Sequence, residues 1–220
     1  MLIRALRFIV SILLIPVSIA FTISFYSGIS SIKTVSESGL VFILGAFSYS
    51  ILHLLIIKLD FLYVSVHELT HAIATLFSGG KVRKIKIRAK EGSVKTTKAN
   101  IFVMLAPYLI PGYTLFIAFL YFGLSFFMDT ARYSDLFIFI IGFTLMFHLA
   151  YTADSIRGKQ SDLIKTGYLF SIFSIYIVNL VVIFFIINLL FKEAIFLDFI
   201  SGAYEKSKDF YYFSWRQLFL

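Results

Sequence analysis

Two histidines and a glutamate share a short segment whose spacing suits a metal site. The segment reads His67-Glu68-Leu69-Thr70-His71, an H-E-x-x-H pattern. Residues four apart lie on one face of an α-helix, so His67 and His71 can both present imidazole nitrogens to one Zn²⁺ ion. Glu68 then lies beside the open coordination position, where it can take a proton from bound water and pass it to a leaving amine. The pattern therefore predicts metal-assisted hydrolysis.

The same three residues could instead be polar groups that join helices. With four histidines and five glutamates in 220 residues, chance produces the pattern in roughly two of a thousand such sequences. A glutamate near the middle of an apolar helix also costs on the order of 3 kcal/mol to insert into a bilayer. Both arguments favour the metal site.

The composition indicates that these residues belong to a membrane protein. Of the 220 residues, 60% are hydrophobic and 15% are charged, whereas soluble domains are about 45–50% apolar. Charge-free runs that approach or exceed the roughly 20 residues needed to cross a bilayer cover residues 8–32, 38–57, 99–128, 136–153 and 166–191. A soluble enzyme is excluded. The formal charge of +8 fits basic loops and lipid headgroups better than nucleic acid, and the absence of cysteine excludes disulfides and thiolate ligands.

We expect an all-α polytopic membrane protein with about six transmembrane helices and one small β-hairpin between the third and the fourth. The third helix, residues 61–78, carries the motif and ends at Gly79-Gly80. Proline and glycine interrupt the fourth span at Pro107 and Pro111-Gly112. A single metal-binding domain is expected over residues 1–191. The tail, residues 192–220, mixes charges with aromatic residues and is expected to lie along the interface as an amphipathic segment.

Six alternating spans place the hairpin (81–98), the 28–38 loop and the 154–165 connector on one side. The loops at 58–60 and 128–135 then face the other side. The first side holds twelve of the 20 lysines and arginines, so the positive-inside rule makes it cytoplasmic.

The motif and its flanks resemble a known family. The segment His67-Glu68-Leu69-Thr70-His71-Ala72, followed by Gly79-Gly80 and a basic hairpin, is similar to the site-2 protease family of intramembrane zinc metallopeptidases. It looks closest to the compact branch that lacks inserted regulatory domains. The resemblance implies one Zn²⁺ per chain, held by the two histidines and a distant aspartate, and cleavage of the membrane helices of other proteins. This chain departs from the family at Thr70, where glycine is frequent, and lacks the family's usual Asp-Gly pair near the third ligand.

The third ligand must reach the two histidines from the hairpin side. They lie roughly 10–16 Å along the helix from its hairpin end. In the six-span topology Asp129 and Asp135 face the opposite side and Asp60 precedes the far end of the helix, so these three are set aside. Asp154 and Asp162 flank the connector on the correct side.

Asp162 is the preferred third ligand. It stands where the sixth span begins, which resembles the family's placement of its aspartate at the start of a membrane helix; Asp154 is the alternative. His148 is a further candidate, as a ligand or as a group that supports one. His53 is expected to be an ordinary core histidine.

The hairpin and its neighbours suggest how a substrate is held. Lys84-Ile85-Lys86-Ile87-Arg88 alternates like a strand, and Glu91-Gly92 supplies a turn. An exposed strand edge can hold a peptide extended by β-augmentation; in that case Ile85, Ile87 and Asn100 are candidate substrate-binding residues. The alternatives are a basic patch that touches anionic lipid and, for Asn100, a helix-entry residue.

These observations lead us to expect an intramembrane zinc endopeptidase, with Glu68 as general base and then acid. Its partners would be a membrane-protein substrate helix and the lipid bilayer, with no nucleic acid. A protease acting on lipid-modified C-termini would need a glutamate ligand, and only Glu193 and Glu205 follow the motif at a distance, beyond the last span. The non-enzyme alternative is a transporter or scaffold that uses the His-Glu site for metal or proton binding.

Overall fold

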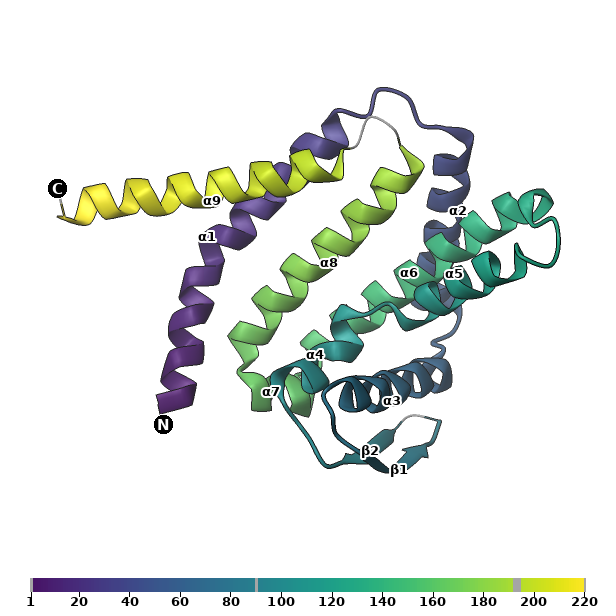
Figure 1. Ribbon diagram of the computed structural model, residues 1–220, viewed down its shortest axis with the longest axis horizontal. Helices are drawn as coiled ribbons and strands as arrows, with labels where there is room; N and C mark the ends of the chain where they lie inside the picture. The colour runs from purple at the N-terminus through teal and green to yellow at the C-terminus, as the bar shows by residue number, and fades with distance from the viewer. Residues whose placement is uncertain (1, 90, 192–194, 220) are drawn as a thin grey trace. The chain divides into compact units, whose positions relative to one another are not determined.

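A computed structural model describes residues 2–89, 91–191 and 195–219 (Figure 1). The chain divides into two compact units: Glu37–Thr166, and Met1–Ser36 together with Gly167–Leu220. All the residues of the predicted metal site belong to the first unit. The predicted tail begins at residues 192–194, which lie outside the described residues.

Within the described residues, four helices are long and apolar enough to cross a membrane, as an integral membrane protein requires. They are Leu2–Ser30 (α1), Glu37–Ile56 (α2, Glu37–Ile51, with the π-turn η1, Leu52–Ile56), Ala131–Arg157 (η2, Ala131–Tyr133, with α6, Ser134–Arg157) and Tyr168–Leu190 (α8). A fifth span results if α4 (Ile101–Leu109) and α5 (Gly112–Leu124), bent by 69° at the predicted Pro111-Gly112 break, are one crossing. The interruption predicted at Pro107 is wrong, because this proline lies inside α4. The expected third span, α3 (Asp60–Phe77), is not among these helices. Its acidic and imidazole side chains lower its hydropathy.

The strands form inside the residues predicted as a hairpin. β1 (Val82–Ile87) pairs antiparallel with β2 (Gly92–Thr96), with Ile85 opposite Val94 and Ile87 opposite Gly92. An irregularity in the register lies between Val82 and Lys84. The sheet has these two strands only within the described part of the chain.

Helices α2 and α6 run in the same direction and their backbones approach closely. A Cβ on Gly45 would collide with the carbonyl group of Phe139, and a Cβ on Gly142 would collide with that of Phe42. Two glycines at the crossing therefore allow a contact that larger residues would prevent, a packing frequent between membrane helices. Further along the pair, Tyr49 is fully buried and packs on the α6 aromatic residues.

Helix α3 lies across the end of this pair instead of returning alongside it (Figure 1). The Lys58 Nζ atom lies 2.5 Å from Asp154 Oδ2, and the hydroxyls of Tyr63 and Ser155 are 2.6 Å apart. The 58–60 loop and the 154–165 connector therefore meet, so the predicted placement of these two segments on opposite sides is wrong. An 18-residue helix is just long enough to cross a bilayer. Here α3 instead packs its polar face against the ends of α2 and α6.

The short helix α7 (Ser161–Thr166) completes this end of the unit by packing against α4. Leu163 is fully buried, and Thr166 donates a hydrogen bond to Met104 Sδ at 3.4 Å. The beginning of α5 packs closely against α3, since a Cβ on Gly112 would lie 2.5 Å from Val66 Cγ2. Helices α4 and α7 thus lie against the face of α3 that carries the motif.

The second unit consists of α1, α8 and α9 (Phe196–Phe219). Helices α1 and α8 run parallel, joined by the hydroxyls of Thr22 and Tyr176 at 2.7 Å. Helix α9 runs back along α1, and Phe199 is buried among aromatic residues of α1 and α8. This unit has its own aromatic core.

Candidate metal centre

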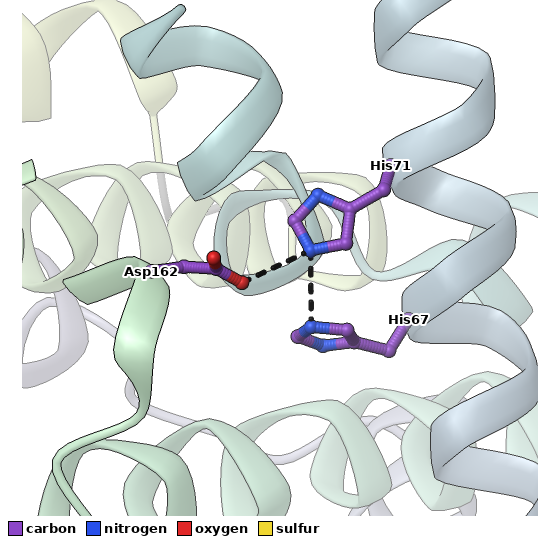
Figure 2. A group of neighbouring side chains, drawn as sticks. All are labelled: His67, His71 and Asp162. Atoms are coloured by element: carbon purple, nitrogen blue, oxygen red, sulfur yellow. Dashed lines mark hydrogen bonds and ion pairs between the residues drawn. The ribbon is translucent and has the colours of Figure 1, made fainter. Parts of the chain in front are cut away.

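Three side chains converge between α3 and α7 (Figure 2). His71 Nε2 lies 3.2 Å from His67 Nε2 and 3.2 Å from Asp162 Oδ2. The three ligand atoms all lie within 4.8 Å of one another, which makes this the one group of three or more potential ligands that could hold a metal ion among the described residues. Two imidazole nitrogens and a carboxylate oxygen are a donor set that suits Zn²⁺ with one position left open.

The two histidines are held in different ways. The Nδ1–H of His71 donates to the backbone carbonyl of Val103 at 2.7 Å, which leaves Nε2 free to face the group. His67 is 6% exposed and its ring lies 5.2 Å, centroid to centroid, from both Tyr63 and Tyr108. A backbone acceptor thus orients one imidazole, and aromatic packing restrains the other.

Asp162 reaches the histidines because α7 is fixed at both ends. Leu163 and Thr166 anchor the helix on α4, and the buried Tyr108 hydroxyl donates to Gln160 Oε1 at 2.9 Å just before it begins. Burial raises the pKa of Asp162, but the hydrogen bond from His71 and the nearby imidazoles outweigh burial, so the pKa lies below its usual value. The carboxylate is therefore held in its ionised, metal-binding form.

Glu68 lies at the junction of two cavities. The first, about 590 Å³, extends between α3 and the end of α6 and is also lined by Tyr63, Asp154 and His67. The second, about 330 Å³, lies between β2 and α4 and is also lined by Val94 and His71. Both cavities are lined by Glu68, Gly92, Ser161 and Asp162. A molecule that occupied both cavities would pass the glutamate and the ligand group.

The alternative third ligand, Asp154, belongs to a different cluster. Its Oδ2 atom lies 2.5 Å from Lys58 Nζ and 3.2 Å from His53 Nε2. His53 is buried, and its Nδ1 lies 3.0 Å from the Tyr49 hydroxyl, as expected for a core histidine. Asp60, set aside earlier, accepts a hydrogen bond from Tyr151 at 2.9 Å and lines the larger cavity. None of these residues joins the metal-binding group.

His148 is buried on α6, beside a small cavity that His67 also lines. It is not part of the three-ligand group. Asn100 caps α4, because its Oδ1 accepts a hydrogen bond from the Val103 N–H at 2.8 Å. The helix-entry interpretation of Asn100 therefore describes its position, and Asn100 is not part of the ligand group.

Strand β2 of the hairpin lines the cavities, whereas the sequence analysis proposed residues of β1 for substrate contact. Ile85 and Ile87 lie on β1, half exposed, whereas Gly92 and Val94 on β2 line the cavities beside Glu68. The Arg88 N–H donates to the Glu91 carbonyl at 2.9 Å, so these two residues form a hydrogen-bonded pair. Because such pairs alternate along an antiparallel ladder, the N–H and C=O groups of Gly92 and Val94 point away from β1.

Sequence reasoning did not identify Tyr63, Gly92, Tyr108 or Gln160 as site residues. Gln160 stands two residues before the predicted ligand Asp162, and this closeness in sequence could have marked it as a site residue. The others come from separate elements, and only the packing of α3, β2 and α4 brings them together.

Comparisons with known proteins do not assign this chain to a family. No protein-family model, no curated protein and no solved structure matches it.

Proposed function

We propose that this chain is an intramembrane zinc endopeptidase that hydrolyses peptide bonds in or near the membrane-spanning segments of other proteins. The single observation that supports it best is the convergence of His67, His71 and Asp162 beside Glu68 at the junction of two cavities. The site-2 protease resemblance of residues 67–72 points to the same activity. The proposed metal is one Zn²⁺ per chain.

The donor set fits this ion. Catalytic zinc sites commonly use two histidines and a carboxylate and leave one position for water or substrate. Zinc bound to such a set polarises water and lowers its pKa towards neutrality. His71 meets a further requirement, since its second ring nitrogen donates to a backbone carbonyl, that of Val103.

Glu68 would carry the protons of the reaction. Its carboxylate takes a proton from the attacking water as the water oxygen bonds to the peptide carbon. The same proton then passes to the leaving nitrogen as the C–N bond breaks, so that one water is consumed and a carboxyl end and an amino end are formed. Glu68 is 7% exposed, so few bulk water molecules reach its carboxylate and compete for its proton.

The outer edge of β2 would hold the substrate. A peptide bond inside a helix is shielded by its own hydrogen bonds, so the substrate must be extended before it is cut. The outward main-chain groups of Gly92 and Val94 offer hydrogen bonds for an added strand, which would run beside Glu68 from one cavity to the other. This proposal moves the substrate contact from Ile85 and Ile87 to β2.

The membrane side follows from charge. The hairpin and the 154–165 connector are rich in lysine and arginine, so we place the opening of the site on the cytoplasmic side. The proposed partners are a substrate helix and the surrounding bilayer, with no nucleic acid. The basic residues of the hairpin would then lie close to anionic headgroups.

Replacement of Glu68 by Gln tests the proposal. The full chain is reconstituted with a reporter in which a membrane helix joins two tags, and cleavage is followed together with bound zinc. Loss of a general base lowers rates by about 10²–10⁴-fold, so Glu68→Gln should abolish most cleavage yet retain the metal. Glu205→Gln, which replaces an exposed glutamate on α9, serves as the matched control.

Two results would contradict the proposal. Undiminished cleavage by Glu68→Gln would remove the assigned chemistry. Zinc binding without cleavage of any helix in a broad reporter panel would favour the transporter or scaffold role.

A further inference from the structure

A separate polar cavity lies in the unit formed by α1, α8 and α9. It measures about 220 Å³ and is lined by the last turns of α1 and the first turns of α9. Its polar lining includes Ser24 and Ser27 from α1 and Ser31, the residue after α1. Helix α9 contributes Asp198 and Lys206. The zinc chemistry proposed above uses none of these residues.

The hydroxyl of Ser24 marks this cavity as a binding site. Ser24 is 3% exposed, and its Oγ atom is buried without a hydrogen-bond partner among the described residues. Other buried serines of α1, such as Ser11 and Ser18, donate to the carbonyl four residues earlier, at 2.7 and 2.8 Å. A buried hydroxyl left without a partner is destabilising, and a hydrogen bond to a ligand in the cavity would remove this cost.

The cavity offers both signs of charge to its occupant. The Asp198 carboxylate and the Lys206 ammonium line it from one helix, and neither forms an ion pair within the described part of the chain. Lys206 Nζ turns back towards the start of α9, 3.5 Å from the Gly202 carbonyl oxygen. Gly202 leaves the space open, because a Cβ there would lie 3.3 Å from Ser24 Oγ. Opposite charges held apart in one small cavity suit a zwitterion.

The position of the cavity indicates what kind of zwitterion reaches it. Helix α1 is 29 residues long, or roughly 43 Å, which exceeds the hydrocarbon core of about 30 Å. A helix of this length extends past the core, so we place its last turns, with the parallel end of α8, in the headgroup layer. Phospholipid headgroups that carry a phosphate and a primary ammonium are abundant there.

We propose that this cavity binds the phosphoethanolamine headgroup of a zwitterionic phospholipid. The phosphate accepts hydrogen bonds from Lys206 and from the Ser24 hydroxyl, and the ammonium donates to Asp198. A choline headgroup lacks N–H donors and is bulkier, and a glycerol headgroup has no cation for Asp198. The site is independent of the peptidase activity.

Lipid binding to the purified full chain tests this inference. The chain is delipidated in mild detergent and titrated with phosphatidylethanolamine, phosphatidylcholine and phosphatidylglycerol, and bound lipid is counted by native mass spectrometry. Loss of one hydrogen bond to a charged group lowers affinity by about tenfold or more, so the ethanolamine lipid should bind at least about tenfold more tightly than the other two. Water-soluble glycerophosphoethanolamine separates a free headgroup from a lipid, and it should bind weakly because it lacks acyl chains.

Isosteric variants locate the site. Asp198→Asn and Lys206→Gln should each weaken phosphatidylethanolamine binding by about tenfold, and Ser24→Ala by less. Asp209→Asn and Lys208→Gln, on the same helix but outside the cavity lining, are the matched controls and should bind as the unchanged chain does. Equal binding of the three lipids would overturn the proposal. So would unaltered binding by Asp198→Asn and Lys206→Gln, both of which replace exposed side chains and leave the α9 core in place.

Discussion

The carboxylate of Glu68 lies directly against the backbone of Gly92, the first residue of β2. A Cβ at position 92 would come within 2.6 Å of Glu68 Oε1 and 2.8 Å of its carboxyl carbon. The backbone of β2 can therefore approach the side chain of Glu68 this closely only because residue 92 is a glycine without a Cβ atom. This contact joins the hairpin, the most basic segment of the chain, to the chemistry of α3.

Replacing Gly92 by Ala should displace Glu68 without emptying the metal site. The added methyl group meets a flexible side chain, so the glutamate rotates away while the strand stays paired. Misplacement of a catalytic group by about 1 Å can cost 10²-fold in rate, and we expect cleavage to fall at least about tenfold with zinc content unchanged. Ser93→Ala is the control on the neighbouring residue, and equal activity of Gly92→Ala and the unchanged chain would show that the contact does not position Glu68.

The ligand assignment predicts a sharp difference between two aspartates. Asp162→Asn and His67→Ala should each reduce bound zinc from about one per chain to nearly none, since three protein ligands are the minimum of a catalytic zinc site. Asp154→Asn should retain the metal, because its carboxylate contacts Lys58 and His53. Elemental analysis of the purified variants measures this directly, and loss of zinc from Asp154→Asn alone would reverse the assignment.

Asn100 should prove to be a structural cap. Its side chain accepts from the Val103 N–H, and the Val103 carbonyl in turn orients His71. Asn100→Ala should lower the free energy of unfolding by about 0.5–2 kcal/mol, and Asn100→Ser or Asn100→Asp should restore most of it, because both residues cap helices well. Thermal unfolding in detergent reports the stability. If Asn100→Ser unfolds like the unchanged chain but cleaves poorly, the residue contacts substrate instead.

The crossing of α2 and α6 should not tolerate a larger residue. In Gly142→Ala the new methyl group would collide with the Phe42 carbonyl group, and overpacking of this kind costs about 1–3 kcal/mol. We expect a lower unfolding midpoint and, since α6 carries Asp154 and Tyr151 at its other end, a disturbed larger cavity. Gly123→Ala on α5 is the control, because nothing lies within 4 Å of a Cβ there; equal destabilisation of both variants would argue against the close contact.

Much of the candidate site could be predicted from local pattern. The H-E-x-x-H spacing places both histidines on one helix face whatever the rest of the fold does, and the alternation at 84–88 requires an extended strand. The preference for Asp162 over Asp154 agrees with the group that the structure brings together. The break at Pro111-Gly112 could be predicted in the same way, because proline removes a helix hydrogen-bond donor, whereas Pro107 lies inside α4 without interrupting it.

The sequence by itself determined the apolar helices α1, α2, α6 and α8, the H-E-x-x-H motif and the hairpin, because composition and periodicity act over a few residues. Tertiary structure alone decided that α3 lies across the ends of α2 and α6, that β2 and not β1 borders Glu68, and that Lys58 pairs with Asp154. These features depend on contacts between residues far apart in the chain. Such contacts form through packing and electrostatic pairing, for which no local spacing is required.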